Sequence, residues 1–232
     1  MALPDRFERY ELKYRLPQAQ YERLLTALTP HLQPDRYFRS TIASLYYDTP
    51  DHRLIRRSLE HPVYKEKLRL RSYGPAAESD PVFVELKKKY DHVVYKRRIT
   101  MPLAAATAFL AGGPAADTQI SREITYFRDF YPQLAPSMLL MYDREAYVAK
   151  SDPSLRITFD HRVRYRTTAL ALHDVESGTL LLPNECLLEV KTGAALPLWL
   201  LRIFEQEKLY RTSFSKYGTA FLQTASEGGQ HP

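Results

Sequence analysis

The sequence predicts an α+β fold, in which helices pack outside a closed eight-stranded antiparallel β-barrel. Three observations support this. At least six segments alternate charged and apolar residues with period two, the helical segments between them are few and short, and 17 tyrosines favour strands. Period two puts alternate side chains on opposite faces of a strand. If the sheet closes on itself, one set of faces lines a lumen and the other meets the helices.

The alternation is clearest in residues 65–73, KEKLRLRSY, where a Lys or Arg occupies every second position up to Arg71. Taken alone, the pattern of this strand predicts that its charged side faces solvent on the outside of the protein. With the other strands it predicts that Arg69 and Arg71 point inward, that Lys67 lies nearer a mouth, and that Leu68 and Leu70 pack outward under helices. The other alternating segments are residues 9–16, 82–89, 92–99, 155–166 and 185–191. In residues 155–166, Arg162, Arg164 and Arg166 are expected in a solvated continuation of the strand.

Four helices are expected between the strands. Residues 17–28, 102–110 and 197–210 each start at a proline, and residues 121–130 start at Ser121 as the cap. Asp48, in the turn sequence DTP, is expected to cap a further short helix. Because no linker is visible, residues 1–225 are predicted to form one domain and residues 226–232 a disordered tail.

Composition narrows the class of partner. The chain has 33 Lys plus Arg against 27 Asp plus Glu, a net charge of +6, which favours anionic partners. The single cysteine, Cys186, cannot form an internal disulfide, and no apolar run spans a bilayer, so a soluble cytoplasmic protein is expected. No glycine-rich phosphate loop occurs, and the histidines lack zinc-site spacing.

A charged interior requires neutralisation, because each ion loses several kcal/mol of solvation on burial. Some carboxylates fall on the same strand faces as the Lys and Arg residues and offset part of their positive charge. They are Glu11, Glu85, Asp160, Glu185 and Glu189. A bound polyanion would neutralise the remaining Lys and Arg, and a carboxylate among them could hold a divalent metal. Nucleic acid is disfavoured, because the aromatic residues alternate opposite the cations rather than among them.

Eight short motifs in one order resemble a known family. They are ELKY at 11–14, SLYYDTPD at 44–51, KLRLRSYG at 67–74, VFVELKKK at 82–89, YDREAY at 142–147, LRITFD at 155–160, LLEVK at 187–191 and FSKY at 214–217. Over nearly the whole chain, this order resembles the catalytic domain of the VTC (vacuolar transporter chaperone) polyphosphate polymerases. These form a branch of the CYTH-like, or triphosphate tunnel metalloenzyme, superfamily.

The resemblance implies a triphosphate tunnel fold and an ATP-dependent polymerase that moves the γ-phosphate onto polyphosphate with Mn²⁺ or Mg²⁺. ATP, inorganic polyphosphate and pyrophosphate are the implied ligands. By motif match, phosphate binding falls to Lys13, Arg69, Arg71, Lys87, Lys96, Tyr142, Arg144, Arg156, Lys191, Ser215 and Lys216. Glu189 would hold the metal, and Arg69, Arg71, Lys216 and Glu189 would be catalytic. Tyr142 has packing as an equal alternative.

The first strand departs from the superfamily's hydrolases and cyclases. Their ExExK pattern reads Arg9, Glu11 and Lys13 here, so one acidic position is lost and a two-metal triphosphatase is less favoured. Two alternatives stay open: a triphosphatase on the same fold and a non-catalytic polyphosphate-binding module. No regulatory or membrane segment is expected, so a separate membrane protein would have to translocate any polymer. The oligomeric state is not predicted.

Overall fold

The computed structural model describes residues 10–91 and 93–228, which contain nine strands and six helices. The expected strand residues Arg9 and His92 lie outside the described residues. The chain divides into two compact units. Unit 1 comprises Met1–Ser40, Tyr142–Val163 and Leu182–Phe214, and unit 2 comprises Thr41–Met141, Arg164–Leu181 and Ser215–Pro232. Each unit has its own core.

The strands form one antiparallel sheet in the order β1-β9-β7-β6-β2-β3-β4-β5, and β8 pairs with β7. The predicted α+β class is confirmed. The predicted closed barrel of eight strands holds only approximately: within the described residues no pair joins β1 to β5, so the sheet is open there, and a ninth short strand, β8, pairs with β7. The strands are β1 (Tyr10–Pro17), β2 (Leu32–Asp48), β3 (Tyr64–Tyr73), β4 (Pro81–Tyr90), β5 (Val93–Pro102), β6 (Ala135–Ala149), β7 (Arg156–Arg166), β8 (Thr179–Leu180) and β9 (Glu185–Thr192).

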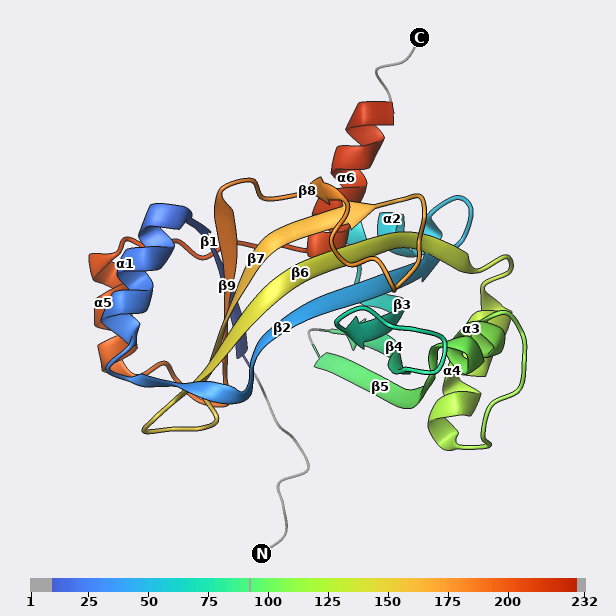
Figure 1. The fold of residues 1–232 in the computed structure, drawn as a ribbon, viewed down its shortest axis with the longest axis horizontal. Helices are drawn as coiled ribbons and strands as arrows, with labels where there is room; N and C mark the ends of the chain where they lie inside the picture. The colour runs from blue at the N-terminus through green and yellow to red at the C-terminus, as the bar shows by residue number, and fades with distance from the viewer. Residues whose placement is uncertain (1–9, 92, 229–232) are drawn as a thin grey trace, which may run out of the picture. The chain divides into compact units, whose positions relative to one another are not determined.

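In unit 1, two helices cover the apolar faces of the strands. Figure 1 shows α1 (Gln18–Leu28, blue) beside α5 (Leu198–Gln206, orange-red). Their apolar stripes pack with the strand residues opposite the charged parity, among them Leu16, Leu188 and Val190. The helix expected over 197–210 is shorter, because Lys208 adopts a left-handed conformation with φ 53° that ends it.

In unit 2, α3 (Leu103–Leu110) and α4 (Gln119–Phe130) lie beside β5, as Figure 1 shows. Leu68 and Leu70 of β3 are buried in the same core, which confirms the predicted register of this strand. The expected cap Ser121 is wrong. Thr118 caps α4, and Ser121 is the third helical residue of a reciprocal capping box with Thr118.

Asp48 caps a short helix as predicted. Its carboxylate accepts hydrogen bonds from the backbone N–H of Leu54 at 2.8 Å and of Ile55 at 3.0 Å, in the first turn of α2 (Arg53–Leu59). The last helix, α6 (Lys216–Gly228), was not predicted and includes three residues of the expected tail. Tyr217 of α6 donates its hydroxyl to Asp48 at 3.0 Å, which ties α6 to this cap.

Of the three arginines expected in solvent, Arg164 is instead buried and Arg166 is half-buried. Arg164 is 1% exposed and donates to the Val175 carbonyl at 2.9 Å, and Arg166 donates to the Asp174 carboxylate at 2.6 Å. Arg162 is exposed and has a positive φ of 46°, which departs from extended strand geometry. Beyond it, Arg164 and Arg166 hold the loop that follows β7.

No helix within the described ranges is both long and apolar enough to span a membrane.

Candidate functional site

The charged face of unit 2 gathers four basic side chains around one carboxylate. We call Arg69, Arg71, Lys96, Arg98 and Glu85 the cation cluster. Strand register creates it, because Arg69 lies opposite Glu85 and Glu85 opposite Arg98 in adjacent antiparallel strands. The Glu85 carboxylate is 2.7 Å from Arg69 Nη2, 2.7 Å from Lys96 Nζ and 3.7 Å from Arg71 Nε. Arg98 Nε donates to it at 2.7 Å.

The electrostatics of the cluster favour anions. Glu85 is 1% exposed, and burial alone would raise its pKa, but Arg69, Arg71 and Lys96 lower it strongly. Burial lowers the pKa of Lys96 in spite of its pairing with Glu85. A single carboxylate therefore faces four cations, and positive charge remains on this face to attract phosphate.

A second row of cations borders the cluster. Lys67, Lys87 and Lys96 lie opposite one another on β3, β4 and β5. Lys87, a predicted phosphate-binding residue, is exposed, and it shares the parity of Glu85. Arg71 lies opposite Ser44, whose hydroxyl its Nε approaches at 3.4 Å.

Unit 1 carries a different cluster, in which charges are matched. We call it the balanced cluster; its members are Glu11, Lys13, Arg144, Asp160, Glu189 and Lys191. Arg144 forms a two-point contact with Asp160, at 2.6 and 2.7 Å, and reaches Glu189 at 3.2 Å. Lys13 lies opposite Glu189 and is 3.1 Å from Glu11 and 3.7 Å from Glu189. Lys191 is 3.4 Å from Glu189.

The donor set of the balanced cluster is compatible with a divalent ion that also binds phosphate. No group of three His, Cys, Asp or Glu able to hold a metal occurs in the described part of the chain. However, Glu11 and Glu189 share Lys13 and Lys191, and Mg²⁺ is typically held by one or two carboxylates plus phosphate oxygens. Thr158 lies opposite Glu189, and its buried hydroxyl has no hydrogen-bond partner in the described structure. Carboxylate and hydroxyl oxygens are the donor type that Mn²⁺ and Mg²⁺ bind.

The remaining predicted site residues are dispersed. In unit 1, Tyr142 is buried beneath the Arg144 guanidinium, 5.2 Å from its ring centroid, and Arg156 is 2.8 Å from Asp35. In unit 2, Ser215 accepts a hydrogen bond from the Gly218 N–H at 3.2 Å in the first turn of α6, where Lys216 is half-buried. Ser215 therefore has a capping contact besides any role toward a ligand.

Arg98 and Tyr46, on the charged face of unit 2, were not among the predicted site residues, and neither were Glu85 and Lys67. Arg98 shares the parity of Lys96, so alternation within β5 could have identified it. Tyr46 lies opposite Arg69, and Arg69 Nη1 donates to its hydroxyl at 3.0 Å. Its signal in SLYYDTPD is weak, because a tyrosine in a strand is most often a packing residue.

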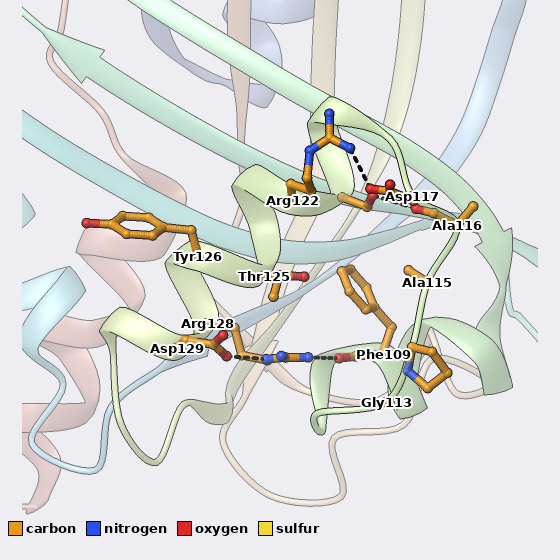
Figure 2. Close-up of a pocket in the computed structure, with 12 residues that line it drawn as sticks. Phe109, Gly113, Ala115, Ala116, Asp117, Arg122, Thr125, Tyr126, Arg128 and Asp129 are labelled. Carbon is orange, nitrogen blue, oxygen red and sulfur yellow. Dashed lines mark hydrogen bonds and ion pairs between the residues drawn. The ribbon is translucent and has the colours of Figure 1, made fainter.

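A shallow pocket of about 470 Å³ lies elsewhere in unit 2, between the end of α3, the following loop and α4. Figure 2 shows that its charged side chains are engaged locally: Arg122 with Asp117, and Arg128 with Asp129 and the Phe109 carbonyl. No predicted site residue lines this pocket.

Comparison with solved structures identifies the fold class. A "putative adenylate cyclase" from Bacillus halodurans is similar at a TM-score of 0.55 and 15% identity, covering 88% of this chain and 92% of that one. Another from Vibrio parahaemolyticus has a TM-score of 0.47 and 12% identity, covering 91% and 97%. The fold assignment rests on the first. The chain shares the fold of that structure, an antiparallel sheet with helices packed against it, and its sheet is open along the described path.

The family assignment follows from the sequence. The family model described as the VTC domain matches residues 8–224, and the chain belongs to this family. No curated protein matches the chain. Membership indicates a polyphosphate-related function.

Proposed function

We propose that the protein is an ATP-dependent polyphosphate polymerase that transfers the γ-phosphate of ATP to a growing inorganic polyphosphate chain. The observation that carries this proposal is the cation cluster of unit 2, in which four basic side chains face one buried carboxylate. VTC family membership supports the choice of polyphosphate among the possible anions.

The cluster suits phosphate chemistry in two ways. The three guanidinium groups can each make two parallel hydrogen bonds to phosphate oxygens, whereas Lys96 supplies a compact charge. Two polyanions repel each other, and this repulsion falls when fixed cations lie between their phosphates. We therefore assign Arg69 and Arg71 to binding and stabilising the phosphates that react, and Lys96 and Lys87 to binding along the chain.

The reaction needs little proton chemistry. A terminal oxygen of the polyphosphate chain attacks the γ-phosphorus of ATP, a new P–O–P bond forms, and the bond between the γ-phosphorus and its bridging oxygen breaks to release ADP. The attacking oxygen is already an oxyanion, so no strong general base is required. Catalysis then consists mainly of alignment and of stabilising the negative charge of the transferred group.

The proposal assigns metal binding to Glu189, with Glu11 as the second carboxylate. Mn²⁺ or Mg²⁺ held there would neutralise phosphate oxygens and orient them. Lys13 and Lys191 contact both carboxylates, so they can move onto phosphate oxygens when the ion takes their place. Lys13, Arg144, Arg156, Lys191 and Tyr142 are assigned to phosphate binding in unit 1, and Ser215 and Lys216 in unit 2, with Lys216 also catalytic.

The test is to incubate the purified protein with ATP and MnCl₂ and to separate the products by gel electrophoresis. We expect long-chain polymer that an exopolyphosphatase degrades, and we expect Arg69→Ala to lose it. Orthophosphate as the sole product would instead indicate a triphosphatase. Tight polyphosphate binding without turnover would indicate a binding module. Either result would overturn the polymerase proposal.

A further inference from the structure

Tyr46 belongs to the cation cluster, although it carries no charge at neutral pH. It lies on β2 opposite Arg69, and the same row of facing residues continues to Glu85 and Arg98. Arg69 divides its guanidinium between two partners: Nη2 is 2.7 Å from Glu85, and Nη1 donates to the Tyr46 hydroxyl at 3.0 Å. Because that hydroxyl accepts from Arg69, its own proton can be donated to a ligand oxygen.

The charges around Tyr46 favour its ionised form. Burial would raise the pKa of its phenol, but Arg69, Lys67 and Arg71 of β3 more than offset this and lower the pKa to about 8. Glu85 of β4 pairs with Arg69 and lies 3.7 Å from Arg71, and Lys96 and Arg98 of β5 also contact it. Any phosphate that binds Arg69 and Arg71 therefore adds negative charge close to the Tyr46 hydroxyl.

Tyr217 provides a contrast within the same stack. The Tyr46 and Tyr217 rings are stacked, with centroids 4.2 Å apart and planes inclined by 19°. The Tyr217 hydroxyl donates to Asp48, and burial and the Asp48 charge raise its pKa strongly. Lys67 Nζ lies 5.5 Å from the Tyr217 ring centroid. The stack thus holds the Tyr46 ring in place, while only Tyr46 of the pair can ionise near neutral pH.

We propose that Tyr46 is a ligand-positioning residue whose neutral hydroxyl donates a hydrogen bond to a phosphate oxygen held by Arg69 and Arg71, so that polyphosphate binding takes up a proton at Tyr46. The inference rests on the proposed function, since it names a residue of the same phosphate site. In the free protein, the phenolate fraction shares Arg69 with Glu85. The incoming phosphate disfavours that phenolate, which gains a proton from solvent and becomes the donor.

The sign of the pH dependence follows from this exchange. A ligand that raises the pKa of a group binds together with a proton wherever that group is partly deprotonated. Affinity for polyphosphate should therefore fall as the pH rises past about 8, the pKa of Tyr46 in the free protein. Lys96 also loses charge at high pH, because its pKa is lowered. This loss of charge at Lys96 occurs in the wild type and in Tyr46 variants alike. The difference between their pH dependences of polyphosphate affinity therefore measures the contribution of Tyr46.

Calorimetric titration of the full chain with long-chain polyphosphate, at about pH 7, 8 and 9 and in buffers of different ionisation enthalpy, tests the proposal. Tyr46→Phe keeps the stacked ring and removes the hydroxyl. The matched control is Tyr47→Phe, because Tyr47 faces the apolar core and its pKa is raised to about 12. We expect wild type and Tyr47→Phe to take up a fraction of a proton at pH 8 to 9. Tyr46→Phe should take up less and bind about tenfold more weakly at pH 7.

Equal proton uptake and an equal pH slope in Tyr46→Phe and wild type would overturn this inference and leave the polymerase proposal standing. If wild type does not bind polyphosphate at pH 7, the proposed function fails and this inference fails with it. A loss of affinity in Tyr46→Phe without any change in proton uptake would reduce Tyr46 to an ordinary contact and would also overturn the proposal.

Discussion

The cation cluster of unit 2 and the balanced cluster of unit 1 form from the same strand pattern but differ in net charge. In each, every second residue of a strand is charged, and the charged residues of adjacent strands lie opposite one another on the same face of the sheet. In unit 1, three carboxylates meet three cations, with Arg144 bound to Asp160 at two points. In unit 2, one carboxylate meets four cations. The same strand pattern thus gives one face with an excess of cations and another on which carboxylates and cations balance.

The largest expected effect is that of Glu85→Gln on stability. This substitution leaves four cations close together without their shared carboxylate. We expect a loss of about 2 to 3 kcal/mol, below the usual cost of breaking a buried pair because several of the cations are partly exposed. Urea unfolding measures it. Polyphosphate should restore more stability to Glu85→Gln than to wild type; equal restoration would mean that the cluster does not attract the polymer.

The same residue gives a pH dependence with a definite sign. Because the pKa of Glu85 is lowered in the folded protein, its contribution to stability is complete above the ordinary value of 4.5. That contribution disappears as the pH falls from 4.5 through the lower folded value. Wild type should lose stability in this window, and Glu85→Gln should lose less. Parallel acid-unfolding curves of the two proteins would contradict this assignment.

Removing the proposed metal ligand should reduce activity. Glu189→Ala is expected to lower Mn²⁺-dependent polymer synthesis about a hundredfold, because a bound metal supplies several kcal/mol of charge stabilisation. Glu185→Ala is the matched control on the same strand, where Glu185 pairs with Arg15 at 2.8 Å. The Mn²⁺-induced shift in melting temperature should persist in Glu185→Ala and disappear in Glu189→Ala. If the Mn²⁺-induced shift persists in both variants, the balanced cluster does not bind the metal.

Salt concentration should affect ligand binding at the two clusters to different extents. If four cations each contact one phosphate, raising the salt from about 50 to 200 mM should weaken polyphosphate binding roughly fiftyfold, by the release of counterions. The Mn²⁺-induced melting shift should change much less, because the ion would be held by the partly buried carboxylates of the balanced cluster. Equal salt dependence of the two ligands would show that the difference in charge balance has no functional consequence.

The smallest expected effect concerns Thr158, opposite Glu189. Its buried hydroxyl makes no hydrogen bond to the described residues, so Thr158→Val should change the free energy of unfolding by less than about 0.5 kcal/mol. Thr158→Ser keeps the hydroxyl and serves as the control in Mn²⁺ titrations. Weaker Mn²⁺ binding in Thr158→Val but not in Thr158→Ser would add the Thr158 hydroxyl to the proposed Mn²⁺ ligands. A large loss of stability in Thr158→Val would instead show that the hydroxyl stabilises the fold.

The sequence predicted the faces of the strands well and their closure poorly. Period two places Leu68 and Val84 in the core of unit 2, and Glu85 and Lys96 together on the other face, because side-chain parity is a local property. Whether β1 joins β5 depends on pairing between the first and last strands of the path, which alternation does not encode.

Local exceptions explain the other errors. Arg162 has a positive φ within β7, and beyond it Arg164 is buried and Arg166 half-buried by partners in the following loop, which strict period two does not encode. Ser121 was expected to cap α4, but Thr118 does so, because two hydroxyl residues three apart can form a reciprocal box. Tyr46 was missed because its role depends on Arg69, which a distant segment places opposite it.

The most direct test of the central claim, that the charged face of unit 2 binds polyphosphate, compares two adjacent arginines of β5. Arg98 contacts Glu85 in the cation cluster, whereas Arg97 points to the opposite side and pairs with Glu123 of α4 at 2.9 Å. Each alanine variant loses one positive charge. In calorimetric titrations with long-chain polyphosphate, we predict that Arg98→Ala weakens binding about tenfold and that Arg97→Ala leaves it within about twofold of wild type. Equal weakening by both variants would mean that net charge, and not this face, binds the polymer.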